Sequence, residues 1–295
     1  MSERQSTRHM ERRLGDAMRK LLPRPIAELV MFTLKQAWAC LFGALMLAGL
    51  IISNQIWNNA WAVQRYDALV IYAITLQALF LIFKLETLAK ARVILLFHLT
   101  GTAMEIFKVN AGSWAYPEPA LLKLWDVPLF SGFMYASVGS FIARVIRIFD
   151  MRFAPYPPLW MTFTLGTLIY LNFFTHHYIL DARYLLFATT LILFIRTRVW
   201  FRIANANYWM PLPLAALLTS FFLWVAENVG TGTWIYVGTG TWIYAGADGI
   251  AMVSLAKLGS WYLLLYVSFV TVTVVMHDAL IPTPITKTRA TSEGR

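Results

Sequence analysis

Long apolar segments alternate with short polar or charged ones along most of this chain. Eight of them have the length of a transmembrane helix, which needs about 20 apolar residues to cross about 30 Å of hydrocarbon. They lie near residues 26–52, 67–84, 92–109, 127–149, 159–176, 181–199, 210–227 and 258–277. The pattern predicts an all-α fold, a polytopic transmembrane bundle of about eight helices.

Charged residues limit these segments, because an ionised side chain at the centre of a bilayer is costly. Uncharged runs of 29, 28, 24 and 20 residues follow Lys35, Arg152, Arg202 and Lys257, respectively. The third and sixth segments hold uncharged runs of only 12 residues. Their terminal charges must therefore form pairs or extend toward the membrane surface.

The composition favours a membrane protein. Hydrophobic residues make up 59% of the chain and charged residues 14%, whereas soluble domains carry about 25% charged residues. An ordinary soluble domain is therefore excluded. Cys40 is the only cysteine, so the chain can form neither an intramolecular disulfide nor a cysteine-based zinc site.

The formal charge of +10 is distributed unevenly between the two sides of the predicted bundle. Of the 25 lysines and arginines, 19 fall on one side, and Lys35 lies inside the first helix. The other side has Arg65, Lys108, Lys123, Arg183 and Lys257. Because cytoplasmic loops hold the positive excess, we expect a multi-pass inner-membrane protein with both termini in the cytoplasm. Anionic membrane lipids are then the expected partners of the basic residues, and no nucleic acid is expected.

Three regions follow from this pattern. Residues 1–25 form a basic cytoplasmic segment, whose apolar residues from Met10 to Leu21 have the spacing of an amphipathic surface helix. A disordered basic tail is the equal alternative. Residues 26–280 form the transmembrane domain, and residues 281–295 form a cytoplasmic tail too polar to fold.

A motif recurs at an offset of 128 residues. Gly112-Ser-Trp-Ala-Tyr116 follows the third predicted helix, and Gly240-Thr-Trp-Ile-Tyr244 follows the seventh. A glutamate ends the preceding helix in each case, Glu105 and Glu227. This pattern predicts two parallel four-helix repeats, about 26–149 and 159–277, related by an axis along the membrane normal.

A second, tandem repeat lies inside the last loop. Residues 230–237 and 238–245 are identical at seven of eight positions, which indicates a local insertion. The alternation of glycine, threonine and aromatic residues is typical of either a small β-hairpin or an aromatic belt at the membrane interface.

Ionisable groups within a membrane domain are candidate functional groups, because the bilayer penalises them. Glu105 and Glu227 are the candidate catalytic acid and base. The expected substrate-binding residues are His98, Lys108, Trp114, Tyr116, His176, His177, Asn228, Trp242 and Tyr244.

Other interpretations of the same residues stay open. Glu105 and Lys108 stand three positions apart and could simply form an ion pair. Glu105, His176, His177 and Glu227 would be the alternative metal ligands, although adjacent helical side chains point about 100° apart. No cofactor is predicted. Serine-nucleophile chemistry is disfavoured because the chain has no G-x-S-x-G motif.

The stretch from Gly101 to Ser140, with Glu227-Asn228 and Gly259-Ser-Trp-Tyr-Leu-Leu264, resembles the uncharacterised bacterial integral-membrane family of YoaT-like proteins. The resemblance covers residues 26–280 and implies architecture without an assigned chemistry. A helix-end glutamate followed by Gly-x-Trp-x-Tyr also looks like the repeats of membrane-bound carotenoid hydratases and ring cyclases. That likeness implies acidic residues that protonate a polyene.

These observations lead to one main hypothesis and two alternatives. An outward-facing, aromatic and acidic cavity would bind a lipid-like or isoprenoid molecule near Glu105 and Glu227, with acid–base chemistry as a further step. The alternatives are a proton-coupled transporter of a small solute and an accessory subunit of a larger membrane complex. An oligomer is compatible with all three, and whether the protein is an enzyme stays open.

Overall fold

A computed structural model describes residues 13, 15–58, 60–83, 85–86, 88–203, 206–231, 240–244 and 253–285 of the 295. Three sequence predictions fall wholly or partly elsewhere. Residues 1–12 of the basic segment, most of the tandem repeat and residues 286–295 of the tail lie outside the described residues. The described part of the basic segment is helical over residues 15–21.

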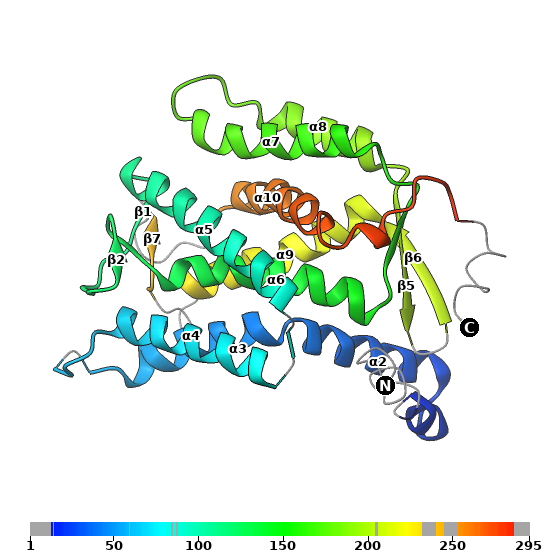
Figure 1. Ribbon diagram of the computed structural model, residues 1–295, viewed down its shortest axis with the longest axis horizontal. Coiled ribbons are helices and arrows are strands. Elements are labelled where there is room, and N and C mark those ends of the chain that lie inside the picture. The colour runs from blue at the N-terminus through cyan, green and yellow to red at the C-terminus, as the bar shows by residue number, and fades with distance from the viewer. Residues whose placement is uncertain are drawn as a thin grey trace.

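Nine helices form a bundle whose members run roughly along the long axis of the molecule (Figure 1). They are α2 (Arg24–Ala39), α3 (Leu41–Ile56), α4 (Arg65–Ile82), α5 (Leu88–Asn110), α6 (Phe130–Ile148), α7 (Leu159–Thr175), α8 (Arg183–Phe194), α9 (Leu212–Thr231) and α10 (Leu255–Thr273), and a short 3₁₀ turn, η1 (His277–Ala279), follows them. Each predicted span has a helical counterpart among them, and α2 with α3 replaces the first.

The predicted first helix, 26–52, is two helices. α2 and α3 meet at Cys40 with a bend of 67°. Arg144 of α6 is fully buried, and its Nη2 donates a 2.8 Å hydrogen bond to the Trp38 carbonyl in the last turn of α2. A cation satisfies the carbonyls that a helix end leaves unpaired, so Arg144 stabilises the break. Lys35, also in α2, donates a 2.8 Å bond to the Arg202 carbonyl.

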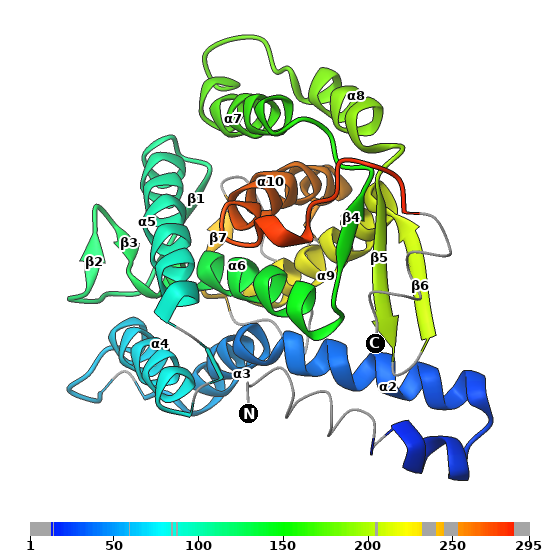
Figure 2. The same cartoon turned by 45° about the vertical axis from the view of Figure 1, so that its right-hand side comes forward.

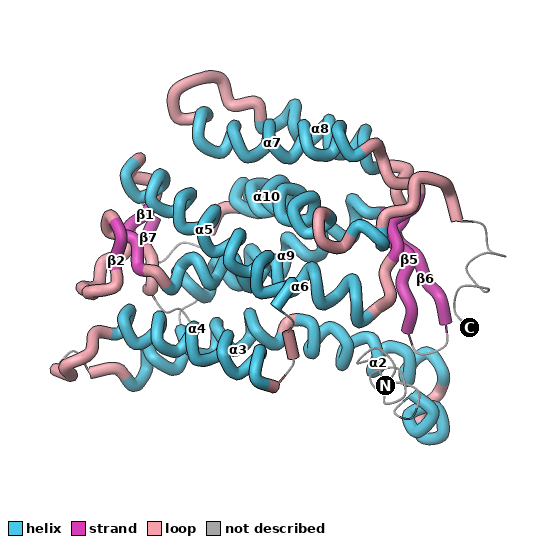
Figure 3. Tube along the Cα trace, in the orientation of Figure 1, coloured by secondary structure: helices cyan, strands magenta, loops and turns pink. Residues whose placement is uncertain are grey.

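The all-α prediction is wrong in part, because three small sheets cap the bundle (Figure 3). The strands are β1 (Trp114–Ala115), β2 (Lys123–Leu124), β3 (Val127–Pro128), β4 (Arg152–Ala154), β5 (Arg198–Ile203), β6 (Ala206–Pro211) and β7 (Ile243–Tyr244). The antiparallel β4–β5–β6 sheet lies at the opposite end of the bundle from β1 and β7 (Figure 2).

Strand β5 also corrects the predicted helix 181–199, which ends at Phe194. Val199, Phe201 and Ile203 are buried and alternate with less buried neighbours. This period of two, together with β-branched and aromatic side chains, favours a strand over a continued helix.

Only part of the predicted membrane topology is confirmed. Three described helices, α4, α9 and α10, are long and apolar enough to cross a membrane, and the bent pair α2–α3 would be a fourth. α7 and α8 are apolar but only 17 and 12 residues long, and α5 and α6 contain charged residues. Eight spans are therefore not confirmed.

Glycines allow α5 and α6 to pack closely. A Cβ at Gly132 of α6 would lie 2.4 Å from His98 Nδ1, and one at Gly139 would lie 2.7 Å from the Phe97 ring. On α5, a Cβ at Gly101 would lie 2.6 Å from the Cβ of Tyr135. The small-residue face predicted for the fourth helix thus contacts α5 of the same chain.

We predict that Gly101→Ala destabilises the protein by about 1–3 kcal/mol, because the new methyl group overlaps an atom fixed to the α6 backbone. Gly166→Ala is the matched control, since its Cβ would lie 3.7 Å from Val270 in ordinary contact. That control should be neutral or stabilising by up to about 1 kcal/mol. Thermal melting in one detergent measures both, and equal melting temperatures would contradict the prediction.

Candidate functional site: two carboxylates held by paired aromatic motifs

The two Gly-x-Trp-x-Tyr motifs meet in space although they lie 128 residues apart. β1 and β7 pair antiparallel, with Trp114 opposite Tyr244 and Ala115 opposite Ile243. The glycine that opens each motif has a positive φ, +68° at Gly112 and +55° at Gly240. Only glycine adopts this region without strain, so the shared glycine gives both motifs the same turn.

Glu105, 4% exposed at the end of α5, accepts three hydrogen bonds. Trp114 Nε1 and Tyr116 Oη donate to its Oε2 at 2.7 and 2.8 Å. Tyr135 Oη, from α6, donates to Oε1 at 2.7 Å. Three neutral donors thus surround this carboxylate, and both of its oxygens are occupied.

Glu227, 8% exposed on α9, has a similar but incomplete set of donors. Trp242 Nε1 donates to its Oε1 at 2.9 Å, and Tyr244 Oη makes a short hydrogen bond to the same oxygen. Within the described residues, Oε2 of Glu227 accepts no hydrogen bond. This oxygen is available to a bound molecule.

The tyrosines of both motifs stay protonated and donate. Burial, followed by the negative charge of Glu105, raises the pKa of Tyr116 well above its ordinary value. Burial and the charge of Glu227 do the same to the pKa of Tyr244. Both hydroxyls are therefore donors over the whole pH range in which the protein is studied.

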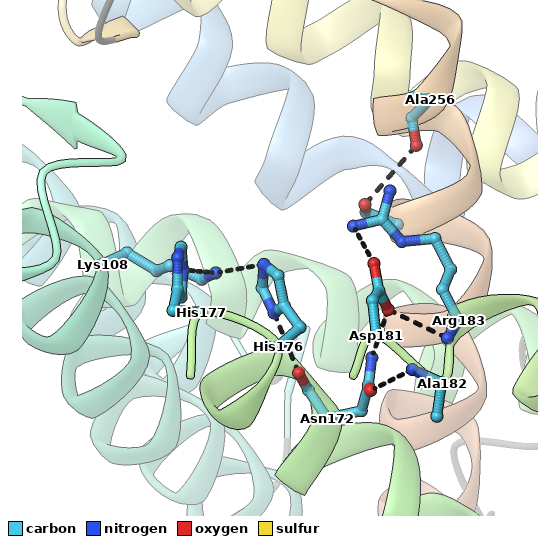
Figure 4. A network of polar contacts seen from close by, with 9 residues as sticks. Lys108, Asn172, His176, His177, Asp181, Ala182, Arg183 and Ala256 are labelled. Atoms are coloured by element: carbon cyan, nitrogen blue, oxygen red, sulfur yellow. Dashed lines mark hydrogen bonds and ion pairs between the residues drawn. The ribbon is translucent and has the colours of Figure 1, made fainter. Parts of the chain in front are cut away.

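Lys108 does not pair with Glu105, contrary to the simplest interpretation of their spacing. Its Nζ lies 2.8 Å from His177 Nε2, 3.4 Å from His176 Nε2 and 4.2 Å from the centre of the Phe173 ring (Figure 4). His176 Nδ1 lies 2.9 Å from the Asn172 carbonyl. This arrangement leaves the His176 Nε2 lone pair facing the ammonium group.

A polar chain continues from the histidines to Arg183 (Figure 4). Asn172 Nδ2 donates to Asp181 at 3.2 Å, and Arg183 Nη2 lies 3.2 Å from Asp181 Oδ2. Burial would raise the pKa of Asp181, but the hydrogen bonds from Asn172 and the Arg183 backbone and the Arg183 charge together hold it below its ordinary value. Asp181 is therefore the ionised partner of Arg183.

Two residues of this site were missed from the sequence. Tyr135 completes the Glu105 cluster, and Lys257 of α10 lies with its Nζ 4.2 Å from the Tyr244 ring and 5.5 Å from the Trp114 ring. Tyr135 stands one helical turn after Gly132 in the glycine-rich stretch, which was the available signal. Lys257 had only its position on the less basic side.

A cavity of about 960 Å³ adjoins both carboxylates. Apolar side chains of α2, α3, α6, α9 and α10 form most of its wall. The polar lining gathers the predicted site residues Glu105, Lys108, Trp114, Tyr116, His176, Glu227, Trp242 and Tyr244, together with Tyr135, Arg183 and Lys257. Acidic, basic and aromatic groups from distant segments therefore share one space.

Three predicted binding residues do not line this cavity. His98 packs beside Gly132, with its ring centre 4.6 Å from that of Phe133. Asn228 is fully buried, donates to the Trp224 carbonyl and accepts from the Val253 backbone. It thus joins α9 to the segment before α10. His177 contacts Lys108 from outside the lining.

The alternative metal ligands do not assemble. Within the described residues, no group of three or more histidine, cysteine, aspartate or glutamate side chains is placed to hold a metal ion. Instead, His176 and His177 both direct Nε2 toward the Lys108 ammonium.

Comparison with known proteins gives a family and a relative. Residues 28–269 match the family described as protein of unknown function, DUF817. The uncharacterized protein YoaT of Bacillus subtilis strain 168 is 41% identical over 251 residues, covering 84% of this chain and 92% of YoaT. No solved structure matches the chain.

We predict that Trp114→Phe destabilises the protein by about 1.5–3 kcal/mol, since a buried carboxylate loses one donor. Trp125→Phe is the control, because Trp125 is 68% exposed, and it should change stability by less than about 0.5 kcal/mol. Thermal melting of the purified variants tests this. Similar losses in both would show that the indole of Trp114 contributes only bulk.

The pKa of His177 lies below its ordinary value, because partial burial and the charges of Lys108, His176 and Lys257 disfavour protonation. We therefore predict that Lys108→Met raises this pKa, whereas Lys123→Met leaves it unchanged. NMR of isotope-labelled histidine measures it, and the chain has only five histidines to assign. Since the fold prefers neutral His177, its contribution to stability decreases as pH falls from the unfolded toward the folded pKa. Identical titrations in wild type and Lys108→Met would refute the assignment.

Proposed function

Because the chain belongs to the DUF817 family, whose function is unknown, its activity must be inferred from its own geometry, and we propose that it binds a lipid-like or isoprenoid molecule in the cavity beside Glu105 and Glu227. The observation that carries this proposal is the division of the cavity wall. Apolar side chains make up most of it, whereas ionisable and aromatic groups gather beside β1 and β7. An amphiphile has the same division.

The apolar part of the wall supports a hydrocarbon ligand. Phe141, Leu223 and Leu264 contribute to it from α6, α9 and α10, and none of them offers a hydrogen bond to a polar solute. Small-molecule sites measure about 300–1,000 Å³, so 960 Å³ is sufficient for a chain of isoprene size. A membrane is the natural source of such a molecule.

Proton transfer to or from the bound molecule is the second part of the proposal. Glu105 is surrounded by donors on both oxygens, whereas Glu227 keeps Oε2 open toward the cavity. Glu227 is therefore the better proton carrier and Glu105 its electrostatic partner. This reverses the roles that the sequence suggested.

The two motifs support an internal repeat with parallel halves. α5 and α9 end, and α6 and α10 begin, at the end of the bundle where β1 meets β7. An axis along the membrane normal relates in-plane strands in antiparallel fashion, as β1 and β7 are. We place the opposite, more basic end, with Arg147, Arg152 and Arg198, in the cytoplasm of a bacterial cell.

Transport of a small solute is the second candidate, favoured by the break at Cys40. Discontinuous helices beside a cavity are a feature of many transporters, and Gln36, Ala37 and Cys40 line this cavity. Uptake into proteoliposomes under a proton gradient tests this candidate. A lipid ligand without uptake would exclude it.

Native mass spectrometry of protein purified in a gentle detergent, with lipid extraction of the same sample, tests the binding proposal. We predict a bound molecule that Ala226→Trp removes, because Ala226 lines the cavity beside Glu227. Ala188→Trp is the control, since Ala188 is exposed on α8 and outside the cavity. Ala44→Phe, on the α3 wall at an exposed position, should also reduce occupancy if Ala226→Trp fails to fold. An empty wild-type protein, or equal occupancy in all variants, would refute the proposal.

A further inference from the structure

The cavity carries cations that the fold leaves without an anionic partner. Lys108, 4% exposed, contacts only His176, His177 and the Phe173 ring. Lys257 contacts only the rings of Trp114 and Tyr244. In the part of the chain that the structure describes, no ion pair joins either ammonium group to a carboxylate.

The nearest carboxylates are already engaged. Both oxygens of Glu105 accept from neutral donors, and Oε1 of Glu227 accepts from Trp242 and Tyr244. Asp181 pairs with Arg183. A lysine that is withdrawn from water needs a counter-charge, and the described residues do not supply one to Lys108 or Lys257.

The two ammonium groups face the same space. Both residues line the cavity, from α5 and from α10. Lys257 lies on the rings of β1 and β7, next to the carboxylate clusters, and Lys108 lies on the histidine side. The positive charges of both act on His177, so the two lysines lie within electrostatic range of one group. His176 and Arg183 line the cavity beside them.

We propose that the ligand carries a phosphate head group, which Lys108 and Lys257 hold between them while the apolar wall takes its hydrocarbon chain. This inference rests on the proposed lipid-binding function and names the chemical class of the ligand. A phosphate monoester carries a charge of about −1.5 to −2 at neutral pH, which matches two ammonium groups. Lysine binds phosphate as a point charge and needs no planar partner geometry.

The carboxylates add selectivity within this arrangement. Glu227 Oε2 faces the cavity and accepts no hydrogen bond in the described residues. A monoester that keeps one proton can donate it to this oxygen, whereas a fully ionised anion is repelled. The ligand is therefore bound as the monoprotonated phosphate, with Glu227 as acceptor and the lysines as donors.

Geranylgeranyl phosphate and geranylgeraniol test this inference, because they differ only in the phosphate. Dissociation constants are measured by native mass spectrometry in one detergent, with the cavity emptied of co-purified lipid. We expect the phosphate to bind about tenfold tighter or more. Inorganic phosphate alone should not compete at similar concentrations, because it has no chain for the apolar wall.

Lys108→Met and Lys257→Met should each remove most of this preference. Affinity for geranylgeranyl phosphate should fall about tenfold, while affinity for geranylgeraniol, which also reports that the variant is folded, stays within about twofold. Lys20→Met is the matched control, since Lys20 is exposed and outside the cavity, and it should change neither constant.

The outcomes separate this inference from the function on which it rests. Equal affinities for alcohol and phosphate, or a phosphate preference that survives both lysine substitutions, would overturn the phosphate assignment and leave lipid binding intact. Competition by inorganic phosphate at equal concentration would assign a free-anion site instead. Failure of both compounds to bind, with no co-purified lipid, would overturn the proposed function itself.

Discussion

The polar end of this protein depends on a buried carboxylate that is satisfied by neutral donors alone. Removing a carboxylate from water is expensive unless hydrogen bonds replace the lost hydration. Glu105 obtains them from Trp114, Tyr116 and Tyr135, which come from β1, the segment after it and α6. The requirement fixes the loop after α5 against the start of α6. The close approach at Gly101 brings Tyr135 within reach.

The helices were largely predictable because charges mark their ends. α4, α9 and α10 lie within a few residues of the predicted spans. The break at Cys40 was not predictable, because no proline or glycine stands there and the Arg144 that stabilises it lies 106 residues from Trp38. Strand β5 was hidden by its apolar composition, which fits a short helix equally well, and its pairing with β4 and β6 decides the outcome.

The site was predictable where a motif recurs and not where contacts depend on tertiary structure. Glu105, Glu227 and their tryptophans were found because the same residues stand at both ends of the 128-residue offset. Spacing alone suggested that Lys108 neutralises Glu105, but the loop after α7 brings His177 to the lysine instead. Asn228 was named for its place beside Glu227, yet adjacent helical positions point in different directions, and its side chain serves the backbone of Val253.

The pairing of β1 with β7 also has a mechanical consequence. Trp114, which holds Glu105, lies opposite Tyr244, which holds Glu227. Each strand is thus tied at one side to a carboxylate of its own half and at the other to the backbone of the opposite half. The four elements form a cross-brace, in which loosening one carboxylate pulls on the donors of the other. Entry of a ligand beside one half is thereby communicated to the second, and the two halves respond as a unit.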